Sequence, residues 1–467
     1  MLRNSTLFVL DPAGTGAFQM KSSINMLQGS IWNKLILFAL PLAATSILQQ
    51  LFNSADVAVV GQFAGNQALA AVGVNGPVIN IMIMMFVGIS IGVNVCLANL
   101  IGAKDMEKAN LTVHTAITIS LILGVVLAVA GNLLAVPLLK LLNTQEDILD
   151  LAALYLRIYF AGMPFIMLYN FENAIFRSKG NTKLPLLVLI AAGVINVGMN
   201  LFFVAVCGMN VEGVAIATVI SNALSAVVLL ISLMKDDAYT RFSFRRMKIN
   251  GLVLKRIIRI GFPAGVQSTV FALSNMFVMA AMNSLGSDAV AANTVSTYLD
   301  IFVYFLVDAF AQAATSFVGQ NYGAGQLDRC RRITRISVGL GILFGAALAG
   351  IFLLLPRFFL GLYSSDPLIV EMATQRAYIV VPFAVFNVIY GTESGALRAY
   401  GYSTIPAVIT VFCVCGIRII WIYTIFAQVR TFEMLFWAYP ISWMSCNLFL
   451  TIAYLILIKK VKPTANI

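Results

Sequence analysis

An isolated carboxylate stands in one of the most apolar stretches of the chain. Between Leu35 and Ala103 the sole charged residue is Asp56. A carboxylate inside a bilayer costs roughly 2.5–3.5 kcal/mol on insertion scales, and acids kept there serve transport or pair with a cation on another helix. We interpret Asp56 as a group that exchanges a cation or a proton, with a purely structural ion pair as the alternative.

Three uncharged polar residues are expected at the depth of Asp56. At 1.5 Å per residue, Asn196, Asn200 and Thr218 fall in the same half of the membrane as Asp56. Asn196 and Asn200 are four residues apart and therefore share a helix face. One acid, two amides and a hydroxyl suit a proton or a hard cation, although hydrogen bonding between helices would also explain the two Asn residues. We predict that these four residues form a coupling-ion site.

A second set of polar residues lies in the C-terminal half. Asp300 and Arg418 have compatible expected depths, which predicts a buried ion pair between them, with contact to a transported compound as the alternative. The candidate residues for lining a substrate cleft are the following: Asn53, Asn275, Asp300 and Asn387.

No enzyme signature accompanies these residues. The sequence has no Walker loop, no nucleophile elbow and no paired-carboxylate or His-rich metal motif. The six cysteines are scattered and form no metal or redox motif. We therefore expect no enzyme activity, no cofactor, and no metal beyond a possible Na⁺ at Asp56.

The elements that position these residues are transmembrane helices. Of 467 residues, 60% are hydrophobic and 10% charged, whereas soluble domains carry roughly 25% charged residues. Apolar segments of about 20 residues or more span a bilayer. Twelve are predicted, at approximately 33–61, 68–101, 111–142, 148–176, 184–207, 212–234, 252–285, 289–320, 332–363, 368–397, 404–428 and 432–458.

The distribution of Lys and Arg predicts the orientation. Cations concentrate in alternate connections, at 104–108, 177–183, 235–259, 329–335 and Arg398, and in the tail from Lys459. By the positive-inside rule both termini are cytoplasmic in a plasma or inner membrane. This distribution accounts for the net charge of +11, so no nucleic-acid partner is expected. Membrane lipid and small molecules are the expected partners, and the expected state is a monomer.

The chain repeats itself in order and spacing. Leu40-Pro41 recurs as Phe262-Pro263, Gly102-Ala103 as Gly323-Ala324, and Arg157 as Arg376. Six spans per repeat give a parallel repeat, as in secondary transporters. The predicted division is a disordered tail or mis-assigned start (1–25), an N-lobe (26–234), a cytoplasmic linker (235–251), a C-lobe (252–458) and a cytoplasmic tail (459–467).

Several motifs resemble one transporter family. Leu40-Pro41, Asp56-Val-Ala-Val-Val-Gly61, Leu100-Ile-Gly-Ala103, Arg177-Ser-Lys-Gly-Asn-Thr-Lys-Leu-Pro185 and its echo Leu397-Arg-Ala-Tyr-Gly401 are similar to the multidrug and toxic compound extrusion (MATE) transporters. The resemblance covers about residues 26–460.

The resemblance implies an all-α membrane protein of two six-helix lobes around a cleft. It implies efflux of cationic lipophilic compounds driven by inward H⁺ or Na⁺, with Asp56 as the first-helix acid and Asn196, Asn200 and Thr218 in its pocket. One branch of the family also has a Glu in the seventh helix and an Asp in the tenth, where this chain has Phe271 and Asn387. This departure favours coupling through the N-lobe.

Two other functions remain open at this stage. A lipid-linked oligosaccharide flippase of the same superfamily would be expected to line its cleft with several cations, and the spans hold few. A membrane enzyme acting on lipid would need a catalytic cluster that the sequence lacks.

Overall fold

The computed structural model describes residues 23–236 and 240–462, so most of the predicted tail and part of the linker lie outside it. Within these ranges every regular element is helical. Eleven helical stretches are long and apolar enough to cross a bilayer, and the bent pair α4 and α5 makes a twelfth. The prediction of an all-α membrane protein with twelve spans is confirmed.

The elements of the N-terminal half are α1 (Ile31–Val59), η1 (Val60–Ala64), α2 (Asn66–Gly102), α3 (Met106–Leu141), α4 (Glu146–Ala161), α5 (Met163–Ser178), α6 (Lys183–Asn200), η2 (Leu201–Val206) and α7 (Val211–Met234). A short turn, η3 (Phe244–Arg246), lies in the linker. The elements of the C-terminal half are α8 (Gly251–Asn283), α9 (Ser287–Gly323), α10 (Leu327–Leu354), α11 (Pro356–Gly361), α12 (Pro367–Ala384), α13 (Asn387–Ala399), α14 (Thr404–Thr410), η4 (Val411–Gly416), α15 (Ile417–Trp421), η5 (Ile422–Phe426), α16 (Phe432–Phe436) and α17 (Ala438–Ile458).

Proline breaks several spans at places that hydropathy does not reveal. The fourth span bends by 50° between α4 and α5, where Gly162 is followed by Pro164 in the first turn of α5. The predicted span 332–363 is likewise interrupted, because α10 ends at Leu354 and Pro356 starts α11. Proline lacks a backbone N–H and its ring clashes with the preceding turn, so a helix ends or bends before it.

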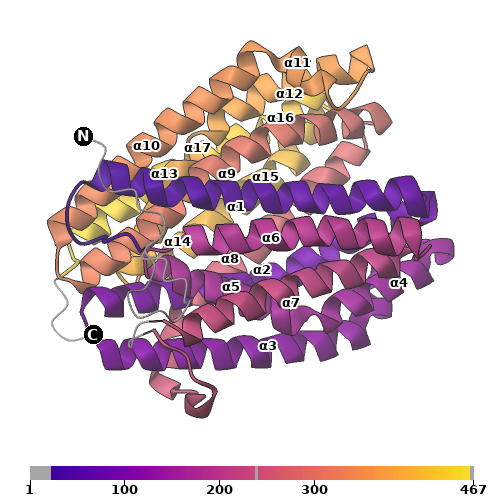
Figure 1. Cartoon of the computed structure of the whole chain (residues 1–467). Coiled ribbons are helices and arrows are strands. Elements are labelled where there is room, and N and C mark those ends of the chain that lie inside the picture. The colour runs from indigo at the N-terminus through magenta and orange to yellow at the C-terminus, as the bar shows by residue number, and fades with distance from the viewer. Residues whose placement is uncertain (1–22, 237–239, 463–467) are drawn as a thin grey trace, which may run out of the picture.

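The helices run side by side in an elongated bundle, and the start of α1 and the end of α17 lie at the same end of it (Figure 1). We call this the termini end, and the opposite one the far end. Helix α1 lies along the boundary between the two halves, with α6 on one side and α9 on the other (Figure 1). Its first turns, including Leu35 and Phe38, share a core with the C-terminal half, and the rings of Phe38 and Phe317 meet edge to face at 5.4 Å.

Glycines allow the two halves to approach at backbone distance near the termini end. A side-chain carbon on Gly102 would collide with the backbone oxygen of Gln320, and one on Gly323 with the backbone oxygen of Asn99. Helices α2 and α8 touch in the same manner, Gly88 against Gly265. Small residues permit such contacts between membrane helices.

Polar groups close the same end across the two halves. Asn94 donates to Ser316 at 3.1 Å, and Asn99 donates to the backbone oxygen of Ala399 at 3.1 Å. Gln320 donates to the backbone oxygen of Ser178 at 2.7 Å. Since buried polar groups are costly unless hydrogen-bonded, these bonds favour the arrangement in which the halves are in contact at the termini end.

The glycine contact gives the first testable prediction. Gly102→Val places a side chain against the backbone of α9, so the termini end opens and transport falls at least tenfold while expression persists. Spin labels at Glu107 and Arg332, exposed positions on opposite halves, measure the opening as an increased distance. The control is Gly76→Val in the same helix, where nothing lies within 4 Å of the added carbon. An unchanged label distance in Gly102→Val would refute the assignment.

The orientation in the membrane gives the second prediction. Arg245 and Gln145 are exposed positions, in the linker between α7 and α8 and in the turn between α3 and α4. In a cysteine-free background, a single cysteine at Gln145 should react with an impermeant reagent on intact cells, and one at Arg245 only after lysis. The reverse pattern would place the termini outside.

Candidate functional site

Asn200 contacts Asp56 from behind, whereas the other three residues of the predicted coupling-ion site, Asp56, Asn196 and Thr218, line one small cavity in the N-terminal half. Its volume is about 80 Å³, and Asp56 is the one charged side chain among the described residues that line it. Asp56 comes from α1, Asn196 and Asn200 from α6, and Thr218 from α7. Asn200 is fully buried, so the cavity wall is closed on that side.

Hydrogen bonds hold Asp56 in place. Asn200 Nδ2 donates to Asp56 Oδ1 at 2.5 Å and is 3.3 Å from Asn196 Oδ1. Thr218 Oγ1 lies 3.3 Å from Asp56 Oδ2 but 2.9 Å from the backbone oxygen of Val214. A hydroxyl has one proton to donate, so Thr218 serves either Asp56 or Val214 at a given moment.

The backbone beside these residues departs from α-helical geometry. The π-helical turn η1 begins four residues after Asp56, and η2 begins directly after Asn200. Turns of this kind are rare and often occur at functional sites.

Asp56 has no ion pair among the residues that the structure describes. The alternative that it pairs structurally with an Arg or Lys therefore finds no support in the geometry. A carboxylate without a counter-ion, held by amide and hydroxyl groups beside a small cavity, can take up and release a proton or a small cation.

The candidate cleft residues separate into two cavities. Asn53 lines the small cavity with Asp56. Asn275, Asp300 and Asn387 line a second cavity of about 350 Å³, the C-half cavity, which lies in the C-terminal half. The four residues thus do not border a single pocket.

The C-half cavity joins an aromatic wall to polar groups. Phe271, Tyr304, Tyr439 and Trp443 supply rings, and the rings of Tyr439 and Trp443 meet at 5.5 Å. Its volume falls within the roughly 300–1,000 Å³ typical of ligand pockets, whereas the cavity at Asp56 is of a size for ions and water.

The predicted pair of Asp300 with Arg418 is wrong. Asp300 instead receives two hydrogen bonds from Arg376, at 2.8 and 3.4 Å, and Arg376 also donates to Ser296. Arg418 donates to Asn275 at 2.9 Å. Depth along a helix does not tell which neighbour a side chain faces, and α12, which carries Arg376, packs against α9, which carries Asp300.

Sequence reasoning passed over Arg376 and the aromatic residues as parts of this site. Arg376 was visible as the repeat of Arg157 and as a charge within an apolar span. Tyr439 and Trp443 carried no comparable signal, because aromatic residues are common in apolar spans.

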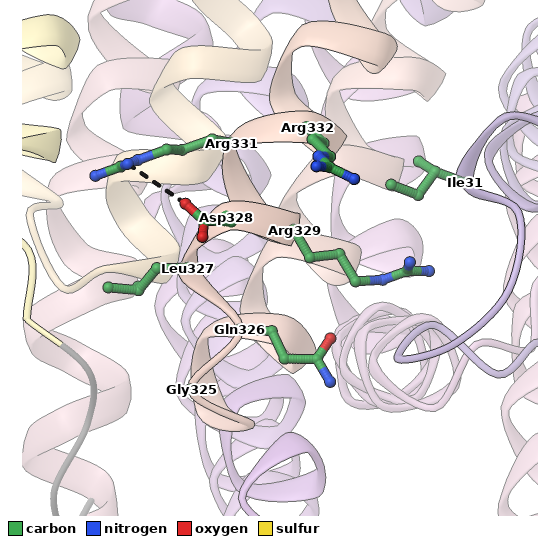
Figure 2. A pocket seen from close by; sticks show the side chains of 8 residues that line it. All are labelled: Ile31, Gly325, Gln326, Leu327, Asp328, Arg329, Arg331 and Arg332. Atoms are coloured by element: carbon green, nitrogen blue, oxygen red, sulfur yellow. Dashed lines mark ion pairs between the residues drawn. The ribbon is translucent and has the colours of Figure 1, made fainter.

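A larger groove of about 650 Å³ lies at the termini end, where the turn between α9 and α10 faces the start of α1. Figure 2 shows Arg329 directed toward the segment that precedes Ile31, and Arg331 turned away toward Asp328. Arg329 donates to the backbone oxygen of Gly29 at 3.0 Å and so fastens this segment to α10. The groove is remote from Asp56 and serves that attachment.

Comparison with known proteins decides the family. The sequence model of the MatE family matches residues 41–202 and again 263–424, which together make up most of the chain. The chain belongs to the MatE family. It is thus a transporter of the multidrug and toxic compound extrusion type, built as two homologous halves.

Relatives and solved structures agree with this assignment. The chain is 29% identical over 402 residues to the probable multidrug resistance protein YoeA of Bacillus subtilis, covering 84% of this chain and 86% of YoeA. It is 28% identical over 364 residues to the FAD transporter of Shewanella oneidensis, covering 75% and 78%.

Among solved structures, the outward-facing conformation of a multidrug resistance MATE family transporter has a TM-score of 0.88 at 22% identity, covering 94% of this chain and 98% of the other. A transporter of the same superfamily from Pyrococcus furiosus has a TM-score of 0.87 at 22% identity, with the same coverage. At this identity the likeness shows the fold.

The corrected ion pair gives the third prediction. Asp300→Asn leaves Arg376 buried without its counter-ion and should destabilise the protein by about 3–5 kcal/mol, seen as a lower melting temperature in detergent. Replacing both residues, as Asp300→Leu with Arg376→Met, should restore most of the loss. The control is Asp288→Asn, an exposed acid on the same helix, expected within about 0.5 kcal/mol of wild type. Equal melting temperatures for Asp300→Asn and Asp288→Asn would contradict the pairing of Asp300 with Arg376.

Proposed function

We propose that this transporter exports cationic, lipophilic compounds in exchange for protons, with Asp56 as the group that carries the proton. The observation that supports this most directly is the unpaired carboxylate of Asp56 in its small polar cavity. A carboxyl group that must alternate between charged and neutral forms needs hydrogen-bonding partners for both forms. It must also lack a permanent cationic partner, because such a partner would hold it in the charged form.

Thr218 supplies those partners. When Asp56 is charged, the hydroxyl of Thr218 rotates to donate to Oδ2, and Asn200 donates to Oδ1. When Asp56 is protonated, its own O–H donates to Thr218 Oγ1, which in turn donates to the backbone oxygen of Val214. Both states are satisfied by the rotation of one hydroxyl, so the proton moves without rearranging the helices.

The charge on Asp56 supplies the coupling. A cationic compound held close to Asp56 is favoured while Asp56 is negative and disfavoured once it is protonated. Because coupling between two ligands is reciprocal, bound cation equally lowers the proton affinity of Asp56. The small cavity is far below the volume of a drug, so the compound acts on Asp56 across its boundary and does not occupy it.

Na⁺ is the second candidate for the coupling ion. Asn200 Oδ1 is buried and has no hydrogen-bond partner among the described residues, and amide oxygens are suitable ligands for a hard cation. In the present geometry, however, the amide nitrogen of Asn200 occupies the place beside Asp56 that a Na⁺ would need. We therefore favour the proton.

The relatives support export of foreign compounds, since several are named multidrug resistance or multidrug export proteins. The FAD transporter among them extends the range to other organic molecules. We further propose a monomer in the plasma or inner membrane with cytoplasmic termini. A lipid-linked oligosaccharide flippase is less well supported, because it would be expected to need several cations in its cleft, and Arg376, the one cation among the described residues that line the C-half cavity, is neutralised by Asp300.

The fourth prediction tests the coupling. In sealed vesicles, an imposed pH gradient alone should drive efflux of a cationic dye, and an Na⁺ gradient at fixed pH should not. Asp56→Asn should lower pH-driven efflux at least tenfold at normal expression, because its amide no longer exchanges a proton. The matched control is Asp147→Asn, which removes an exposed acid at the far end and should transport normally. Efflux driven by an Na⁺ gradient alone would show that Na⁺, not the proton, is the coupling ion. Full activity of Asp56→Asn would refute the assignment of Asp56 as the coupling site.

A further inference from the structure

The two halves place opposite charges at corresponding helix contacts, those between the first and fifth spans of each half. In the N-terminal half the first and fifth spans meet where Asn200 donates to Asp56. In the C-terminal half the corresponding spans meet where Arg418 of α15 donates to Asn275 of α8 at 2.9 Å. The first pair carries a negative charge, and the second carries a positive one.

Arg418 is buried with incomplete compensation. Its side chain is fully buried, Nε donates to Ser442, and the guanidinium lies over Tyr439 at 4.1 Å and near the ring of Trp443 at 5.8 Å. Nη2 has no hydrogen-bond partner, and no ion pair of Arg418 is present among the described residues. Rings stabilise a cation in part, but a buried charge still favours a counter-ion.

The uncompensated charge lies directly behind the C-half cavity. Three residues in contact with Arg418, namely Asn275, Tyr439 and Trp443, themselves line that cavity. The other charged residues in the lining, Asp300 and Arg376, neutralise each other. The cavity with its wall therefore has a net positive charge, and a positive field inside a poorly polarisable wall favours an anion.

We propose that the C-half cavity is a binding site for aromatic carboxylates, with Asn275 as the hydrogen-bond donor and Arg418 as the counter-charge behind it. The carboxylate accepts a hydrogen bond from Nδ2 of Asn275, whose Oδ1 is already held by Arg418. The ring system packs against Tyr304, Tyr439 and Trp443, and the volume of about 350 Å³ accommodates two fused rings with a short acidic arm.

This site goes beyond the proposed export of cations and does not depend on it. It needs no ion gradient, and it lies in a different half of the molecule from Asp56. Arg418 disfavours a cationic compound in the C-half cavity, so this site takes compounds of the opposite charge to those whose export Asp56 is proposed to drive.

Equilibrium binding of three matched probes to the purified full-length protein tests the proposal. The probes are radiolabelled 2-naphthaleneacetate, its neutral methyl ester, and the trimethylammonium compound with the same ring. Wild-type protein should bind the carboxylate about tenfold more tightly than the ester and the ester more tightly than the cation, as one partly screened charge predicts. Arg418→Met should abolish the preference for the carboxylate over the ester while ester binding persists.

Three further variants locate the site and keep the test informative if Arg418→Met misfolds. Met279→Trp fills the cavity from α8 and should abolish binding of both the carboxylate and the ester, whereas Leu273→Trp, exposed on the same helix, should not. Asp56→Asn should leave carboxylate binding unchanged. Equal affinity of wild type for carboxylate and ester, or undiminished carboxylate binding in Met279→Trp, would overturn the proposal.

Discussion

The close contact of backbone with backbone at the termini end determines the arrangement of the rest of the molecule. Gly102 and Gly323 each lie against a backbone oxygen of the opposite half, and the two contacts are repeats of one another. With this end closed and its polar groups bonded across the two halves, the two cavities lined by candidate site residues lie farther along the bundle. Both the cavity at Asp56 and the C-half cavity are formed by residues beyond that contact.

Much of the fold follows from the sequence because its signals are strong and local. Twelve apolar segments, the recurrence of Pro41 as Pro263, and that of Gly102 as Gly323 predict two six-span halves, which the structure and the family match confirm. The breaks at Pro164 and Pro356 were not predicted, because the residues around each proline are apolar on both sides. Hydropathy alone then describes one continuous span.

The candidate site was accessible to the same reasoning only in part. The residues around Asp56 meet because three spans carry polar side chains at one depth. Each of these helices is rotated so that its polar side chains point toward those of the other two. Asp300 shows that expected depth alone does not identify an ion-pair partner, because Arg376 and Arg418 both lie within reach of it along the membrane normal. The choice between them depends on which helix lies beside α9, and that is a property of the assembled bundle.

The packing of α1 also bears on how the protein is made. Leu35 and Phe38 lie in α1, yet their buried partners in α9 are synthesised only after the entire first half. Until then this face of α1 is covered by lipid, so the first half reaches its final form only when the second half inserts. The two homologous halves are therefore not independent folding units. An N-terminal half expressed alone would leave this apolar face of α1 without its protein partner and free to associate with another hydrophobic surface.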